Sequence, residues 1–156
     1  MSKTTRATQV LARAGIPHTV HAYDYDPEAT RIGLQAAEAL GVAPGEVFKT
    51  LMAMVDGKPV CVLAPSDREI SLKKLAAAFG GKSAAMMRPA EAERLTGYHV
   101  GGISPLGQKR TVPTLVDAAA LALPEIFLNG GQRGLQVRVK PDDLVRVLQA
   151  RTEAVT

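Results

Sequence analysis

Tryptophan is absent from this chain of 156 residues, and its aromatic residues are only three tyrosines and three phenylalanines. RNA-binding sheets that stack bases need several exposed aromatic side chains, so the composition argues against a platform of that kind. Any binding of nucleic acid would then rest mainly on contacts with the backbone. The formal net charge of +4 permits attraction to phosphates without establishing it.

Cysteine occurs once, at Cys61, so the chain cannot form an internal disulfide, which agrees with a reducing compartment. Cys61 lies in the apolar run PVCVLAP, residues 59–65, which offers no cation to lower the pKa of a thiol. We therefore expect a buried and unreactive cysteine. The histidines are not spaced as metal ligands, and we recognise no motif for a metal, a cofactor or a catalytic triad.

Long hydrophobic runs are also missing, because no segment approaches the ~20 apolar residues of a transmembrane helix. The first 15 residues lack the apolar block of a secretory signal and are typical of an ordinary helix. We expect a cytoplasmic protein without membrane contact. Hydrophobic residues make up 46% of the chain and charged residues 22%, which is typical of globular proteins. With no repeat or linker, residues 1–156 are predicted to form one compact domain.

The chain mixes helical and extended patterns without regular βαβ alternation. Helices are expected where apolar residues recur every three or four positions between capping residues: from Ala7 to Gly15, from Thr30 to Gly41, from Ser71 to Gly80, and after Pro89 and Pro141. Strands are expected at 18–26, 47–55, 59–65, 83–87, 111–117 and twice within 125–139, including two hairpins. The fold class is therefore α+β, with a mixed, mostly antiparallel sheet flanked by helices.

Lys49 is the most unusual residue of the first hairpin, because it interrupts the apolar strand VFKTLMAMV. One interpretation is a lysine at the start of the strand whose side chain extends to water. The other is a cation at the mouth of a pocket, where it would orient a carbonyl, hydroxyl or phosphate group. The pattern alone leaves both interpretations open.

Two glycine-rich segments raise a similar choice. Residues 97–110, GYHVGGISPLGQKR, have neither helical nor strand periodicity, and Gly101 and Gly102 would let the backbone approach a ligand closely. Adjacent N–H groups would then form a nest for negative charge, although a structural turn explains the composition equally well. NGGQRG, residues 129–134, is most economically a hairpin turn, from which Arg133 could reach a ligand.

Taken together, VFKTL around Lys49, LTGY at Leu95–Tyr98, VGGISPLGQKR and GGQRGL resemble the YbaK/EbsC family, in order from about residue 5 to residue 150. This family comprises freestanding Cys-tRNA(Pro) deacylases related to the editing domain inserted in bacterial prolyl-tRNA synthetases. The resemblance implies a curved, barrel-like sheet around a pocket and removal of cysteine from tRNA(Pro), with Cys-tRNA(Cys) as a further candidate substrate. It implies aminoacyl-tRNA as a partner, prolyl-tRNA synthetase as another, and neither metal nor cofactor.

The family's functional positions can be matched to this chain residue by residue. The residues that would serve catalysis are Lys49, Gly101, Gly102, Ile103 and Ser104. Those that would bind the substrate are Tyr23, Ile32, Thr50, Pro105, Asn129, Gly130, Gly131 and Arg133. Two of them depart from the family pattern, since we expect an aromatic residue in place of Ile32 and a small hydroxyl residue near Asn129.

The chain shows no evident nucleophile, and this suits the mechanism that the resemblance suggests. The substrate's own cysteine thiol would attack its ester carbonyl and leave a cyclic thiolactone and free tRNA. Lys49 would orient the substrate, and the backbone of Gly101–Pro105 would stabilise the oxyanion. Two alternatives remain: water-dependent deacylation of Ala-tRNA(Pro), and a non-catalytic module that binds tRNA or a synthetase.

Overall fold

The computed structural model describes residues 4–28 and 32–156, with only the backbone described at Ile32. The α-helices are α1 (Arg6–Arg13), α2 (Ile32–Leu40), α3 (Leu72–Ala78), α4 (Pro89–Thr96) and α5 (Pro141–Leu148). The strands are β1 (Thr19–Ala22), β2 (Phe48–Val55), β3 (Lys58–Pro65), β4 (Ala84–Met86), β5 (Thr114–Asp117), β6 (Ile126–Asn129), β7 (Leu135–Val139) and β8 (Arg151–Glu153). The described residues also form two short 3-10 helices, η1 (Pro44–Glu46) and η2 (Ala118–Ala122).

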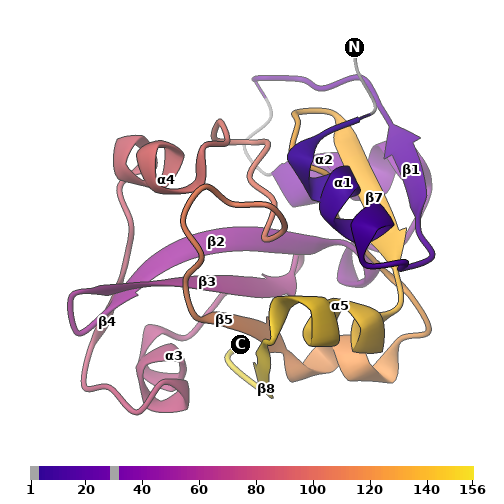
Figure 1. Ribbon diagram of the computed structural model, residues 1–156. Coiled ribbons are helices and arrows are strands. Elements are labelled where there is room, and N and C mark those ends of the chain that lie inside the picture. Colours follow the sequence, from indigo (N-terminus) through magenta and orange to yellow (C-terminus); the bar gives the residue numbers. More distant parts are fainter. Residues whose placement is uncertain (1–3, 29–31) are drawn as a thin grey trace.

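The strands of the described residues form two sheets and not the one sheet that was expected, whereas the predicted α+β class is confirmed. One sheet has five strands in the order β4-β2-β3-β5-β8, in which β5 runs parallel to both β3 and β8. The other has three antiparallel strands in the order β1-β7-β6. An isolated bridge between Val47 and Phe127 connects them, so the sheets meet at one corner and do not close into a barrel. Figure 1 shows β2 and β3 crossing the middle of the molecule, with α4 and α3 on opposite sides of them in that view.

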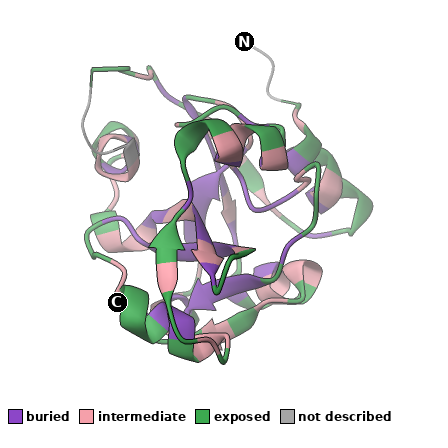
Figure 2. Cartoon of the chain, turned by 90° about the vertical axis from the view of Figure 1, so that its left-hand side faces the viewer, coloured by how far each residue is buried: buried purple, intermediate pink, exposed green. Residues whose placement is uncertain are grey.

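The core fills the space between the two sheets and the helices that cover them. Its largest part joins α1, the β2–β3 hairpin, β6, β7 and α5. Leu135, Val137 and Val139, predicted to share one face of β7, are all completely buried. A second cluster lies under α3, and a third joins α2 to the corner where the sheets meet. In Figure 2 the buried residues follow the central strands, whereas the helices expose their outer sides.

The five predicted helices are confirmed, and the differences lie at the ends of elements. The strand expected over residues 18–26 ends at Ala22, because its partner Leu135 is the first residue of β7. One further hydrogen bond, from the Tyr23 N–H to the turn carbonyl of Gly134 at 2.9 Å, follows it. The cap expected at Thr30 lies outside the described residues. β8 was not predicted, since three residues are too few to show a pattern. No helix in the described part of the chain is long and apolar enough to cross a membrane.

Candidate functional site

A cavity of about 390 Å³ lies at the corner where the two sheets meet, and we call it the pocket. It is lined by the start of β2, the segment from β4 into α4, part of the glycine loop and the facing ends of β6 and β7. Its wall residues are Gly33, Val47, Phe48, Lys49, Thr50, Leu51, Met52, Ser66, Glu69, Met86, Met87, Pro89, Ala92, Val100, Gly101, Ile103, Asn129 and Gln136. Residues distant in the sequence thus meet where β2 leaves the Val47–Phe127 bridge.

Lys49 and Thr50 both line the pocket, which supports the second interpretation of the lysine. Lys49 is half-buried and pairs with Ala64 of β3 in the strand register. It makes no ion pair or side-chain hydrogen bond with the described residues. The Thr50 hydroxyl oxygen is buried and also lacks a partner there. Since folding normally pairs buried polar groups, the start of β2 offers unused hydrogen-bonding capacity to a ligand.

The glycine loop reaches the pocket through Gly101 and Ile103. Gly101 has φ of +91°, and a Cβ there would lie 2.6 Å from the Tyr25 hydroxyl oxygen. A Cβ on Gly102 would lie 2.8 Å from the backbone nitrogen of Arg133. Both positions therefore require glycine, as the loop's composition suggested.

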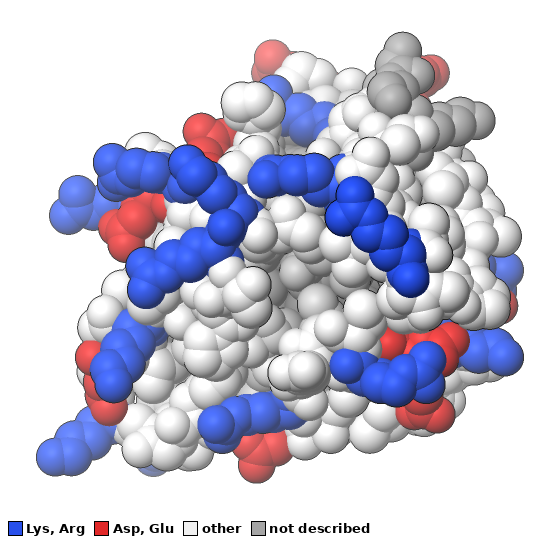
Figure 3. Space-filling model, viewed as in Figure 1, with Lys and Arg blue, Asp and Glu red and all other residues white. Residues whose placement is uncertain are grey.

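The rest of the loop turns away from the pocket. The Gly102 N–H donates to the His99 carbonyl at 2.8 Å, so a local turn already uses it. Ser104 is fully buried, and its hydroxyl accepts the N–H of Leu106 at 3.2 Å. Pro105 lines a second cavity of about 250 Å³ between α1, α5 and the loop. Figure 3 shows a hollow in the face that carries α1 and α5, bordered by lysine and arginine side chains.

The β6–β7 turn supports the glycine loop from the other side. Asn129 lines the pocket, and its amide accepts the N–H of Gly131 at 2.7 Å while donating to the Gly101 carbonyl at 3.2 Å. Gly130 is buried in the turn, where its N–H donates to the Leu135 carbonyl at 2.9 Å. Exposed Arg133 donates from Nε to the Val100 carbonyl at 2.9 Å. Asn129 and Arg133 therefore contact the loop itself.

Gln136 is a pocket residue that the sequence did not reveal. It belongs to β7, is only 3% exposed, and its Oε1 has no partner among the described residues. Tyr23 lies beside it, with its hydroxyl similarly buried and without a hydrogen bond to the described residues. Burial raises the pKa of Tyr23, and the neighbouring Gln136 side chain offsets part of that rise. Alternation along β7 places Gln136 on the other face of the strand from Val137, so the sequence indicated a residue that faces solvent. In the structure the pocket covers that face as well.

Further residues on the wall were also missed. Ser66 donates its hydroxyl to the Val47 carbonyl at 2.6 Å, which fixes the chain after β3 against the start of β2. Gly33 of α2 packs on Ser66 so closely that a Cβ would lie 2.2 Å from its Oγ. Met86 and Met87 supply an apolar side. No sequence motif marks these residues, since the tertiary fold alone brings them together.

Cys61 is buried, as expected, and is 1% exposed. Burial raises the pKa of its thiol to about 12, with the Gln108 amide 3.7 Å from the sulfur. A thiol with such a pKa stays protonated at neutral pH and does not act as a nucleophile. Within the described residues, no three His, Cys, Asp or Glu side chains are grouped as a metal site would require.

Residues 26–147 match the family model of the aminoacyl-tRNA editing domain. The chain belongs to this family. The match spans every segment that lines the pocket, from α2 to β7.

Relatives of this editing-domain protein cover most of it. It is 29% identical over 153 residues to an Enterococcus faecalis protein described as a candidate Cys-tRNA(Pro)/Cys-tRNA(Cys) deacylase, EbsC, covering 97% of this chain and 93% of the relative. It is 30% identical over 118 residues to the Escherichia coli multifunctional Ser/Thr-tRNA deacylase ProXp-y, covering 72% of this chain and 71% of that protein. A crystal structure described as a candidate trans-editing enzyme for prolyl-tRNA synthetase superposes with a TM-score of 0.82 at 24% identity, covering 99% of each chain. The last comparison shows the shared fold.

Proposed function

We propose that this editing-domain protein removes the amino acid from mischarged tRNA in trans, with Cys-tRNA(Pro) as its main substrate and Cys-tRNA(Cys) as a second. One observation carries the proposal: a single pocket collects Lys49, Thr50, Gly101, Ile103 and Asn129, which the family resemblance marked from three separate segments. The description of the Enterococcus faecalis relative supports the choice of the cysteinyl ester.

The pocket suits an aminoacyl group attached to a terminal adenosine. Its volume of about 390 Å³ lies at the small end of the range for ligand sites. Met86, Met87 and Ala92 give it an apolar wall, whereas Lys49, Thr50 and Gln136 supply polar groups. Such a division favours a ligand with an apolar or thiol side chain at one end and ribose hydroxyls at the other.

In the proposed reaction the substrate's cysteine thiol is the nucleophile. The thiol gives up its proton and its sulfur attacks the ester carbonyl carbon, so that negative charge develops on the carbonyl oxygen. The intermediate then expels the 3′-oxygen of the terminal ribose, which takes up a proton, and the products are a cyclic thiolactone and free tRNA. The protein contributes orientation and electrostatics, which together are worth several powers of ten in rate.

Each part of the pocket has a role in this scheme. Lys49 holds the terminal adenosine or the aminoacyl group, and Thr50 lies next to it on β2. The Gly101 N–H faces the developing oxyanion, and one such donor contributes roughly 3 kcal/mol. The buried, protonated Cys61 supports a scheme in which the substrate supplies the nucleophile.

A second candidate is water-dependent deacylation of Ala-tRNA(Pro). The observation that favours it is the pair of buried oxygens without partners, Thr50 Oγ1 and Gln136 Oε1, which could hold an attacking water. The Escherichia coli relative is described as acting on seryl and threonyl esters, which carry no thiol.

The deciding experiment compares esters on one tRNA(Pro): cysteinyl, 2-aminobutyryl, alanyl, seryl and prolyl. The 2-aminobutyryl group replaces the cysteine sulfhydryl with a methyl group of similar size, so only the nucleophile is lost. Thiol assistance predicts fast turnover of the cysteinyl ester, with thiolactone detected by mass spectrometry, and little turnover of 2-aminobutyryl. Equal rates for these two esters would move the chemistry to water. No turnover of any ester would leave a module that only binds tRNA or a synthetase.

We further propose that prolyl-tRNA synthetase delivers the substrate. A net charge of +4 gives weak, non-specific attraction to tRNA, whereas a tethered complex raises the local substrate concentration. Addition of the synthetase should therefore lower KM for Cys-tRNA(Pro) and leave kcat unchanged. An unchanged KM would contradict this partnership.

A further inference from the structure

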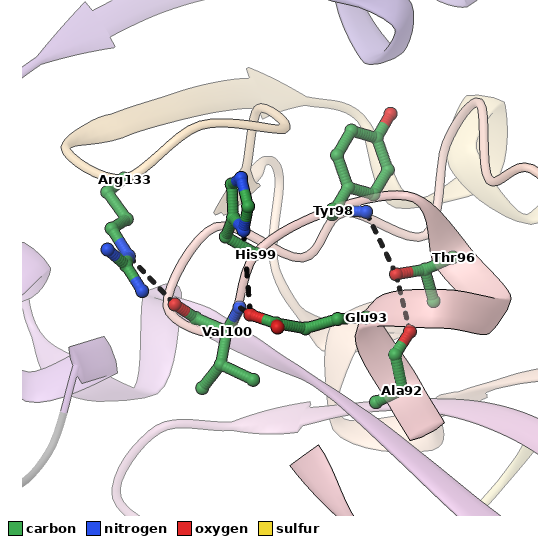
Figure 4. A network of polar contacts seen from close by, with 7 residues as sticks. All are labelled: Ala92, Glu93, Thr96, Tyr98, His99, Val100 and Arg133. Carbon is green, nitrogen blue, oxygen red and sulfur yellow. Dashed lines mark hydrogen bonds and ion pairs between the residues drawn. The ribbon is translucent and has the colours of Figure 1, made fainter. Parts of the chain in front are cut away.

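The peptide groups around Val100 and Gly101 are held by side chains from two other elements. Glu93 of α4 accepts the Val100 N–H at 2.8 Å, and Arg133 donates from Nε to the Val100 carbonyl at 2.9 Å. Figure 4 shows these two side chains approaching Val100 from opposite sides. Asn129 donates to the next carbonyl, that of Gly101, at 3.2 Å. Three consecutive peptide units therefore have fixed orientations.

This arrangement fixes the direction of one further group, the N–H of Gly101. A trans peptide is planar, and its C=O and N–H point in opposite directions. Because Arg133 holds the Val100 carbonyl, the Gly101 N–H of the same peptide must point away from Arg133. The Gly101 N–H itself has no hydrogen-bond partner among the described residues, and Gly101 lines the pocket.

The surroundings of Arg133 explain why it stays in place although it is exposed. Its guanidinium carbon lies 5.7 Å from the centre of the Tyr25 ring. Gly101 fits between these two side chains, since a Cβ there would lie 2.6 Å from the Tyr25 hydroxyl oxygen and 3.4 Å from Arg133 Nε. His99 is close to the other support, with Nδ1 3.6 Å from the Glu93 carboxylate.

We infer that Glu93 and Arg133 are positioning residues that aim the Gly101 N–H at the reacting ester carbonyl. This inference rests on the proposed deacylation, and it gives Arg133 a role other than a contact with tRNA phosphate. Neither side chain touches the reacting atoms. Each acts through the backbone that it holds, so the loss of either should lower kcat more than it raises KM.

Two substitutions of Arg133 separate positioning from charge. Arg133→Met removes both the donor and the charge, whereas Arg133→Gln removes the charge but places an amide nitrogen as many bonds from Cα as the arginine Nε. If Arg133 acts by positioning, Arg133→Met should lower kcat about 10-fold, as expected for one misaligned oxyanion donor, and should change KM by no more than about 2-fold. Arg133→Gln should restore most of kcat. Glu93→Ala should behave like the methionine variant, and Glu93→Gln, which keeps an acceptor oxygen, like the wild type.

Arg151→Met is the matched control. Arg151 is also exposed, also donates to a backbone carbonyl (Ala78, at 3.0 Å) and also stacks on an aromatic ring (Phe79, at 5.0 Å), but it lies on β8 and not on the pocket wall. Its substitution should leave both kinetic constants unchanged. A comparable loss of kcat in this control would show a general effect of removing a surface arginine, and the inference would fail.

The alternative role in phosphate binding predicts a different set of results. Arg133→Met and Arg133→Gln would then raise KM equally, leave kcat intact and reduce the salt dependence of binding. That result, or no effect from any of the four variants, would overturn the inference. Amide exchange at Val100, whose N–H Glu93 accepts, gives a readout that needs no turnover, and exchange should accelerate in Arg133→Met but not in Arg133→Gln. If the wild type deacylates nothing, the proposed function fails, and unchanged exchange rates would separately show that Arg133 does not hold the loop.

Discussion

The two ends of the β2–β3 hairpin treat their polar groups in opposite ways. At the turn end, the Asp56 carboxylate accepts the N–H groups of Lys82 and Ser83 at 3.0–3.1 Å. The backbone N–H of Asp56 donates to the Ser83 carbonyl. At the pocket end, the Thr50 hydroxyl is buried without a partner in the described structure. One hairpin therefore contains a turn whose carboxylate is hydrogen-bonded and a pocket whose buried hydroxyl is not. The difference indicates where a ligand completes the hydrogen bonding.

The largest effect should come from Lys49 at the pocket end. Lys49→Ala is expected to lower kcat/KM for Cys-tRNA(Pro) about 100-fold, because it removes the cation that orients the substrate. The thermal midpoint should change little, since the side chain makes no ion pair with the described residues. Steady-state deacylation and calorimetry test the two halves of this prediction.

Lys58→Ala is the control for this change, because Lys58 is an exposed lysine at the turn end of the same hairpin. Its turnover should match the wild type. Equal losses of kcat/KM in the two variants would show that the two ends of the hairpin do not differ in function, and that the effect comes from the change in net charge.

A smaller effect is expected from Gln136, which faces the pocket from β7. Gln136→Leu should lower kcat/KM about 10-fold, because one hydrogen bond to the substrate is worth roughly 1.5 kcal/mol. The same change should raise the free energy of unfolding, since an apolar side chain of similar volume replaces a buried oxygen that lacks a partner. Denaturant titration gives the second quantity. A variant that is less stable and equally active would assign Gln136 to the core.

Thr50→Val sharpens this test. Valine has nearly the same shape and removes only the hydroxyl, which is buried without a partner in the described part of the chain. The variant should be at least as stable as the wild type and less active. Full activity would remove Thr50 from the site.

The chain of residues 47–65 shows how far the sequence could predict this molecule. The apolar strands and the turn between them were predicted from local pattern, because alternation and turn chemistry act over a few residues. The residues that share the pocket with Lys49 could not be predicted, since Gln136 is distant in the sequence and lines the same cavity only because a bridge joins the two sheets. Lys49, Gly101 and Asn129, which the family resemblance marked as site residues, line one pocket, whereas the resemblance gave no sign that Pro105 lines a second cavity.

The thiol of Cys61, in the middle of β3, should ionise at a lower pH in the unfolded chain than in the native protein. Burial raises the pKa of its thiol from 9.0 to about 12. Below pH 9 both states are protonated, so the thiol adds no pH dependence. As the pH rises toward 12 the unfolded state ionises first, and stability should fall. At pH 8 a thiol reagent should modify the native protein no faster than it unfolds, and rapid labelling would contradict the burial.

The smallest effect on activity is expected at the turn end, from Asp56→Asn. Hydrogen bonds from the backbone of Ser83 and Lys82 lower the pKa of Asp56, so this carboxylate stabilises the fold above its ordinary pKa of 3.8 and loses that effect as the pH falls through the lowered value. Asparagine keeps an acceptor oxygen and tolerates the φ of +48° at this position, so the backbone should be unchanged. The thermal midpoint should fall slightly at pH 7, and its drop between pH 5 and pH 2 should become shallower. Because the turn completes its own hydrogen bonds, kcat/KM should stay at the wild-type value, and a loss of turnover here would mean that the two ends of the hairpin are not independent.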